Sequence, residues 1–92
     1  MNTFQKNIKE WGLKTFPMAT KDSIICHLQK EVKELKESYN PEEAADCFIL
    51  LCHLANKLGC DLLEEAEKKM VINKQRKWGK PDKDGVVEHI RF

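Results

Sequence analysis

The stretch EVKELKESYNPEEAAD, residues 31–46, carries two pairs of acids with a helix start signal between them. Glu31 and Glu34 are spaced E-x-x-E, and Glu43 and Asp46 are spaced E-x-x-D. Residues three apart face nearly the same way on a helix, one turn along, so each pair directs its carboxylates to one side. Two successive helices that pack with these sides facing would bring four carboxylates together.

Such a cluster of carboxylates needs positive charge to be stable. Four like charges roughly 5 Å apart repel one another by about 3 kcal/mol per contacting pair at an effective dielectric constant near 20. Carboxylate oxygens are also the ligands that Mg²⁺ takes in proteins. The stretch therefore predicts a Mg²⁺ site, in which Mn²⁺ could substitute, and indicates an enzyme that acts on phosphates.

Each acid also has a simpler interpretation. The first pair could belong to a solvated helix face among lysines, where an ion pair contributes only about 0.2–0.5 kcal/mol. Glu43 stands where a capping-box acid belongs, three residues after Asn40. Asp46 is harder to explain in this way, because it lies within the otherwise apolar run from Ala44 to Ala55, where an unpaired buried charge costs several kcal/mol.

The chain reads as one all-α domain over residues 1–92, a short four-helix bundle unit. Helix-breaking positions divide it into four helix-like segments and a tail; they are Phe16-Pro17, Asn40-Pro41, Gly59 and Gly79. The predicted helices span about residues 3–14, 20–38, 41–58 and 62–76, and an irregular tail follows over 77–92. We expect no β-sheet. The fourth helix is expected to turn five apolar residues inward, namely Leu62, Leu63, Ala66, Met70 and Val71.

The third predicted helix is apolar on nearly all sides from Ala44 to Ala55. A helix of this kind must be surrounded, and a chain of 92 residues has too few other helices to surround it alone. We therefore expect a homo-oligomer, either a homodimer or a homotetramer.

The charge balance excludes several classes of partner. Sixteen basic and 15 acidic residues leave a net charge of +1, which does not fit a general binder of nucleic-acid polymers. The signs are nevertheless segregated, with ten acids and three bases over residues 31–67 and eight bases and three acids over 68–92. An acidic centre followed by a basic arm suits a metal site next to a polyphosphate.

Cysteine spacing and hydropathy bear on location. The four cysteines show no C-x-x-C spacing and most lie among apolar residues, so we interpret them as small buried hydrophobes in a reducing cytoplasm. The longest purely apolar run, Cys47 to Cys52, is far too short to cross a bilayer, and we expect no membrane association.

A basic stripe and several rings are the remaining candidate site residues. The basic stripe consists of Lys69, Asn73 and Arg76, which recur at helical spacing on the fourth predicted helix. We include Lys80, which follows four residues later, as an extension of this stripe. Such side chains can bind phosphate oxygens, although a solvated basic face is the simpler interpretation. Candidates for stacking on a base are Trp11, Phe16 and Trp78. His27 and His53 could be outer partners of the metal site or ordinary hydrogen-bonded or exposed histidines.

The ordered motifs E-x-x-E, E-x-x-D and K-x-x-x-N-x-x-R, followed by Trp78-Gly79, resemble the MazG-type all-α nucleoside triphosphate pyrophosphohydrolases. The resemblance covers about residues 24–79. Residues 42–79, EEAADCFILLCHLANKLGCDLLEEAEKKMVINKQRKWG, are similar to the short phage and bacterial branch linked to dATP/dGTP pyrophosphohydrolase. The resemblance implies a helical bundle, dimeric or tetrameric, that cleaves a (d)NTP between the α and β phosphates to give a monophosphate and pyrophosphate.

The resemblance also implies roles for individual residues. The Mg²⁺ ligands would be Glu31, Glu34, Glu43 and Asp46. Contacts to the triphosphate would come from Lys69, Asn73 and Arg76. A Mg²⁺ ion lowers the pKa of a bound water that attacks phosphorus, and Glu34 could accept the proton of that water.

Substrate choice and biological role stay open at this stage. Only eight residues separate the two acid pairs, so the loop between them is short, and base recognition could come from the N-terminal segment, from His27 or from a neighbouring chain. The role would be house-cleaning of the nucleotide pool or phage nucleotide metabolism. The alternatives are an enzyme like phosphoribosyl-ATP pyrophosphohydrolase and a non-catalytic helical interaction module.

Overall fold

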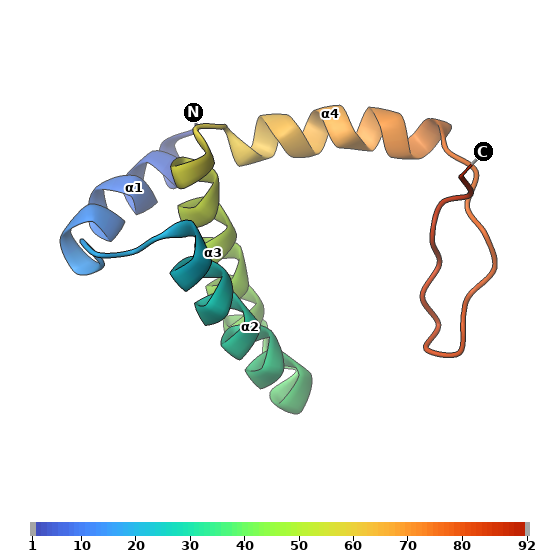
Figure 1. Cartoon of the computed structure of the whole chain (residues 1–92), viewed down its shortest axis with the longest axis horizontal. Coiled ribbons are helices and arrows are strands. Elements are labelled where there is room, and N and C mark those ends of the chain that lie inside the picture. Colours follow the sequence, from blue (N-terminus) through green and yellow to red (C-terminus); the bar gives the residue numbers. More distant parts are fainter. Residues whose placement is uncertain (1, 92) are drawn as a thin grey trace.

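Four α-helices follow one another along the chain in a computed structural model that describes residues 2–91. They are α1 (Thr3–Thr15), α2 (Lys21–Ser38), α3 (Pro41–Leu58) and α4 (Leu62–Gln75), shown in Figure 1. Their ends lie within one residue of the predicted bounds. The all-α prediction is confirmed for the described residues, which form no strand.

Each helix begins after a polar side chain that accepts a backbone N–H from the first turn. These N-cap residues are Asn2, Thr20, Asn40 and Asp61. Caps of this kind each stabilise a helix by about 1 kcal/mol. The connection between α2 and α3 contains only Tyr39 and Asn40, and Tyr39 adopts a left-handed conformation with φ of 52°. So short a connection folds α3 back antiparallel to α2.

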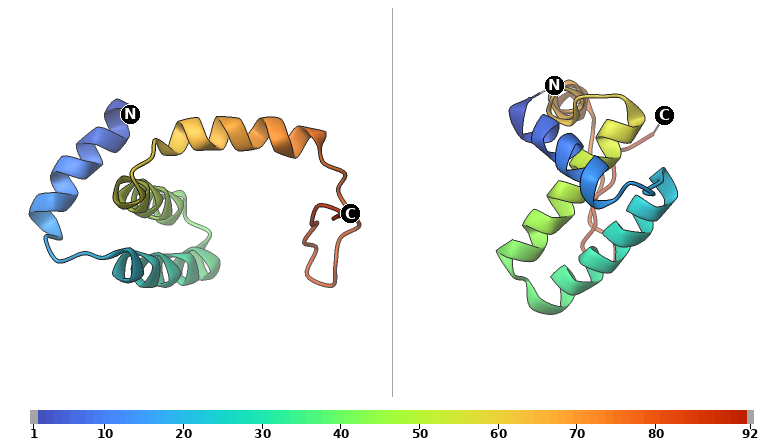
Figure 2. Two further views of the ribbon diagram at one scale, coloured as in Figure 1. Left: turned by 45° about the horizontal axis from the view of Figure 1, so that its top comes forward. Right: turned by 90° about the vertical axis from the view of Figure 1, so that its left-hand side faces the viewer.

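The core lies where α2 and α1 pack against α3. Six apolar residues are buried there, namely Ile8, Ile24, Cys47, Leu50, Cys52 and Ala55. In Figures 1 and 2, α2 and α3 lie side by side over their whole length, and α1 crosses the end of α3 that leads into α4. The antiparallel pair α2–α3 is thus the most extensively packed part of the chain.

Helix α4 does not join the other three in a bundle within one chain. It contacts α3 only near its first turn and then projects away from it, giving the chain extents of 44 × 31 × 23 Å (Figure 1). No residue of α4 is buried. The expected inward face is therefore wrong for the isolated chain, since Leu63, Met70 and Val71 are all more than half exposed.

The tail after α4 folds back on itself. A single antiparallel bridge joins Trp78 to His89, and a turn held by Asp82 lies between them. The Trp78 indole donates a hydrogen bond to the carbonyl of Asn73 at 3.0 Å, which ties the tail to the last turn of α4. Met1 and Phe92 lie outside the described residues.

Among residues 2–91 no helix has both the length and the apolar character required to cross a membrane. The four cysteines are free, with Cys47 and Cys52 buried, Cys60 half-buried and Cys26 exposed. The interpretation of the cysteines as buried hydrophobes thus holds for two of them.

The joint between α1, α3 and α4 is organised by Gln5, whose side chain is completely buried. Its amide nitrogen donates to Asn56 Oδ1 at 2.8 Å and to the Cys60 carbonyl at 2.7 Å. Its amide oxygen accepts the Leu62 N–H at 2.8 Å, at the first residue of α4. One side chain therefore connects α1, the end of α3 and the start of α4.

Replacing Gln5 by leucine should lower the stability of the folded chain. Gln5→Leu leaves the three groups that Gln5 satisfies without partners, and we expect a loss of about 3 kcal/mol in the free energy of unfolding. The control is Gln29→Leu, the same change at an exposed position of α2. Urea denaturation measures both variants, and equal stability of the two would show that the joint is not held by Gln5.

Candidate active site

Three of the four predicted acids meet between α2 and α3. One carboxylate oxygen from each of Glu31, Glu43 and Asp46 lies within 4.8 Å of the other two. Glu31 comes from α2, and the other two come from successive turns of α3. The tight α2–α3 connection produces this arrangement, because it sets the acidic face of one helix against that of the next.

Two of these carboxylates lack partners for buried oxygen atoms. Oε2 of Glu31 and Oε2 of Glu43 are inaccessible to solvent and accept no hydrogen bond from the described residues. Buried polar atoms in proteins are nearly always paired, so two unpaired carboxylate oxygens in one acid cluster indicate that a cation could serve as their partner. Hard oxygen ligands at this spacing fit Mg²⁺ or Mn²⁺.

Glu34 lies beside this group rather than within it. Burial raises the pKa of Glu43, and the negative charges of Glu34 and Glu31 raise it further. The Glu34 side chain is exposed, yet it is close enough to act on Glu43. Its position one turn beyond Glu31 leaves it free to reach a group at the edge of the cluster.

Two expectations about these acids are corrected. Glu43 does not close a capping box, because the Asn40 side chain accepts the N–H of Glu42 and the Asn40 N–H is donated to Ser38 Oγ. Asp46 is exposed, not buried among apolar residues, since the apolar run of α3 packs on one side only within this chain. Its charge is therefore not an anomaly of the isolated chain.

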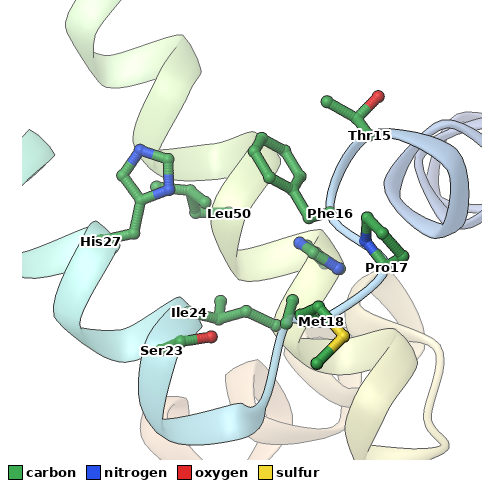
Figure 3. A pocket seen from close by; sticks show the side chains of 10 residues that line it. Thr15, Phe16, Pro17, Met18, Ser23, Ile24, His27 and Leu50 are labelled. Atoms are coloured by element: carbon green, nitrogen blue, oxygen red, sulfur yellow. The ribbon is translucent and has the colours of Figure 1, made fainter.

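A pair of cavities adjoins the acid cluster on the side of α1. The smaller, of about 150 Å³, is lined by Glu31 and Asp46 together with Trp11 and Phe16. The larger, of about 400 Å³, opens beneath the α1–α2 connection and includes Phe16 and Met18. Figure 3 shows Phe16 reaching from that connection toward the space that His27 and Leu50 border from α2 and α3.

Aromatic and histidine rings line these cavities. Trp11 packs edge-on against Phe16 with ring centroids 5.3 Å apart, so two of the three predicted stacking candidates lie together. His27 lies 3.4 Å from the Glu31 carboxylate, measured from Nε2 to Oε1, which links the cavities to the acid cluster. His53 lines both cavities and is 5% exposed.

The surroundings of His53 favour its neutral form. Burial lowers its pKa, and the positive charge of Lys57 and the neighbouring His27 lower it further. A neutral imidazole carries one donor and one acceptor nitrogen. Gly12 of α1 packs directly on this ring, because a Cβ at Gly12 would lie 3.1 Å from His53 Nε2.

The predicted phosphate-binding residues lie away from the acids of the same chain. Asn73 and Arg76 are half-buried and joined by a 3.1 Å hydrogen bond from Arg76 Nη1, while Lys69 and Lys80 are exposed. All four lie on the part of α4 and the tail that projects from the rest (Figure 1). Trp78 lies there too, so it does not join the other stacking candidates within one chain.

The tail adds a histidine and an arginine that sequence patterns did not reveal. His89 packs edge-on against Trp78, and its pKa is lowered by burial and then by the charges of Arg76, Arg91 and Lys69. The fold of the tail thus returns Arg91 to the basic stripe. No helical spacing could have indicated this, because the tail pairs through its backbone.

Comparisons with known proteins agree with this arrangement. Residues 4–92 match a family described as dATP/dGTP pyrophosphohydrolase. A dATP/dGTP diphosphohydrolase of Cyanophage S-2L is 35% identical over 94% of this chain and 84% of its own length. Another, of Salmonella phage PMBT28, is 39% identical over 94% of this chain, which spans only 30% of that relative.

A solved structure is also similar. It is the Cyanophage S-2L MazG-like pyrophosphohydrolase bound to dGDP and three catalytic Mn²⁺ ions per active site. Its TM-score is 0.83 at 32% identity, and the match covers 96% of this chain and 90% of that one. The prediction from the motifs is thereby confirmed at the level of the family and the four-helix fold.

Neutralising Glu43 should stabilise the protein without metal and weaken metal binding. In EDTA we expect Glu43→Gln to melt at a higher temperature than wild type, because one charge of a repelling group is gone. Mn²⁺ should stabilise wild type, by about 2.7 kcal/mol at a hundredfold excess over Kd, and the variant much less. Calorimetric melting with and without Mn²⁺ measures both effects.

The control for this variant is Glu42→Gln, since Glu42 shares the first turn of α3 and the same helix dipole. A pKa raised in the folded state destabilises the ionised form, so lowering the pH through that pKa should stabilise metal-free wild type relative to Glu43→Gln. Identical pH profiles and identical responses to Mn²⁺ would remove Glu43 from the site.

Proposed function

We propose, since this chain belongs to the dATP/dGTP pyrophosphohydrolase family, that it hydrolyses purine deoxynucleoside triphosphates to the monophosphate and pyrophosphate in the presence of Mg²⁺ or Mn²⁺. The observation that carries the proposal is the acid cluster with its two unpaired buried oxygens, placed beside cavities lined by aromatic rings. The names of the relatives support the purine base and the deoxyribose, and the bound Mn²⁺ of the similar structure supports the metal.

The metal would be held by Glu31, Glu43 and Asp46, with Glu34 completing or flanking the set. A divalent cation held there would make a bound water more acidic and would offset the charge that develops on the phosphates. Glu34 is exposed and lies at the edge of the cluster, so it is the carboxylate best placed to accept the proton of the attacking water.

The triphosphate requires positive charge beside the acid cluster. Lys69 and Arg76 can supply that charge and Asn73 can donate a hydrogen bond, but these residues lie on the projecting helix α4 and at its end. The apolar residues that α4 leaves exposed need burial, as do Phe48 and Leu51 on α3. A homo-oligomer in which α4 of one copy covers the acid cluster of another would meet both needs.

The other candidate functions receive less support. The family match favours a purine deoxynucleotide over phosphoribosyl-ATP as substrate. A non-catalytic interaction module does not explain why two carboxylate oxygens are buried without partners. Because both curated relatives are phage proteins, phage nucleotide metabolism is the role that we favour.

The products distinguish this function directly. With Mg²⁺, purified protein should convert dGTP or dATP to the monophosphate and pyrophosphate, and Asp46→Asn should lower kcat by a hundredfold or more, which corresponds to about 3 kcal/mol. Anion-exchange chromatography separates pyrophosphate from orthophosphate. Formation of orthophosphate and dGDP instead would contradict cleavage between the α and β phosphates.

Two inactive variants should restore each other if the site is shared between copies. Asp46→Asn removes an acid, and a variant with Lys69→Ala and Arg76→Ala removes the basic stripe. Random pairing of the two in a symmetric dimer places intact acids opposite an intact stripe in about a quarter of all sites. Activity of the mixture measures this, after mass spectrometry has verified that the copies exchange.

Recovery to about a quarter of wild-type activity is the expected outcome for a symmetric shared site. If mixed oligomers form and stay inactive, each site takes its acids and its stripe from one chain. The projecting α4 would then have to fold back on its own chain in solution.

A further inference from the structure

His53 is an unusual buried histidine. Its side chain is 5% exposed, and no hydrogen bond to either ring nitrogen is present among residues 2–91. The two nitrogens are nevertheless not among the fully buried unpaired atoms of these residues, so each keeps some accessible surface from which a hydrogen bond can be made. Because His53 lines both cavities beside the acid cluster, the space that it faces is where a hydrogen-bond partner would bind.

The surroundings of His53 are those of a site for a flat, partly polar molecule. The Phe16 ring lies 6.0 Å from the His53 ring between centroids, at an angle of 30°. The larger cavity has a volume of about 400 Å³, within the usual range of roughly 300–1,000 Å³ for small-molecule sites. Aromatic side chains with a few placed polar groups are the usual means of binding a nucleobase.

The lining residues also place the ring close to the acids. Phe16 and His53 line both cavities, and the smaller cavity is lined in addition by Glu31 and Asp46. A base in the larger cavity would therefore lie near the acid cluster. Gly12 of α1 leaves room for the ring, because a Cβ added there would lie 3.1 Å from His53 Nε2 and 3.3 Å from Cδ2. A side chain at Gly12 would therefore force the His53 ring to shift.

We propose that this cavity binds the purine base of the substrate, with Phe16 against the face of the base and His53 hydrogen-bonded to its edge. The inference rests on the function proposed above and names the residue that reads the base. Burial and the charge of Lys57 lower the pKa of His53, which favours the neutral ring, in which one nitrogen can donate and the other can accept. His53 therefore acts in substrate recognition and does not touch the phosphates.

The first test compares a substrate that has a base with one that lacks it. His53→Leu keeps the volume of the side chain and removes both nitrogens. We expect the KM for dGTP to rise tenfold or more, while kcat changes by less than about twofold. Hydrolysis of 2-deoxyribose 5-triphosphate, which has no base, should be unchanged, and so should the stabilisation by Mn²⁺. The KM of His53→Gln for dGTP should lie between those of the wild type and His53→Leu, because glutamine retains a hydrogen-bond donor and an acceptor.

A structural role for His53 gives a different pattern. If His53→Leu slows the substrate without a base as much as dGTP, or leaves dGTP hydrolysis unchanged, His53 does not read the base. An increase in KM that His53→Gln does not reduce at all would likewise contradict a hydrogen bond.

A binding experiment separates this inference from the proposed function and also covers a variant that fails to fold. In a Trp78→Phe background Trp11 is the single tryptophan, and it lines the smaller cavity. With EDTA present, dGMP should change the Trp11 emission in a saturable way, whereas 2-deoxyribose 5-phosphate should not. The base site would be overturned if dGMP and 2-deoxyribose 5-phosphate changed the emission equally, or if dGMP had no effect at about 10 mM. An enzyme that hydrolyses no triphosphate but binds dGMP in this way would leave the base site standing and contradict the function.

Discussion

The repulsion between carboxylates that α2 and α3 hold face to face is the constraint on which the rest of the chain depends. The two-residue connection and the buried contacts of Ile24, Cys47 and Leu50 force Glu31 against Glu43, although two of their oxygens then lack partners. This arrangement lowers the stability of the metal-free protein, because like charges are held close together. The same arrangement provides carboxylate oxygens at a spacing that suits a cation. The raised pKa of Glu43 has the same origin, since burial and the charges of Glu34 and Glu31 disfavour its ionised form.

Much of this arrangement was predictable because it depends on local chemistry. Caps at Asn40 and Asp61, Pro41 at the start of α3 and Gly59 at its end set the helix bounds, since these residues act within one turn. The convergence of Glu31 with Glu43 and Asp46 followed from three-residue spacing and a short connection. Local rules of this kind transfer directly from sequence to structure.

The errors arose where burial depends on what lies opposite. The apolar residues of α4 indicated an inward face. Hydrophobic spacing predicts that one face of a helix is covered, but it does not predict which element covers it. Asp46 was interpreted as buried for the same reason, because the run around it is apolar on all sides while only one side packs within the chain. Gln5 escaped notice, and the burial of His53 was not predicted, because a polar residue in a helix gives no signal of its burial.

The joint at Gln5 has a mechanical consequence for α4. The helix has 14 residues and leaves the core at Leu62, so at about 1.5 Å per residue its far end acts as a lever of roughly 21 Å. A change of about 10° in direction at the joint would move Arg76 by roughly 4 Å, more than the length of a hydrogen bond. The direction of α4, and with it the position of the basic stripe, is therefore set at the opposite end of the helix by the side-chain amide of Gln5. If the stripe binds phosphate as proposed, residues far from the substrate would control where it lies.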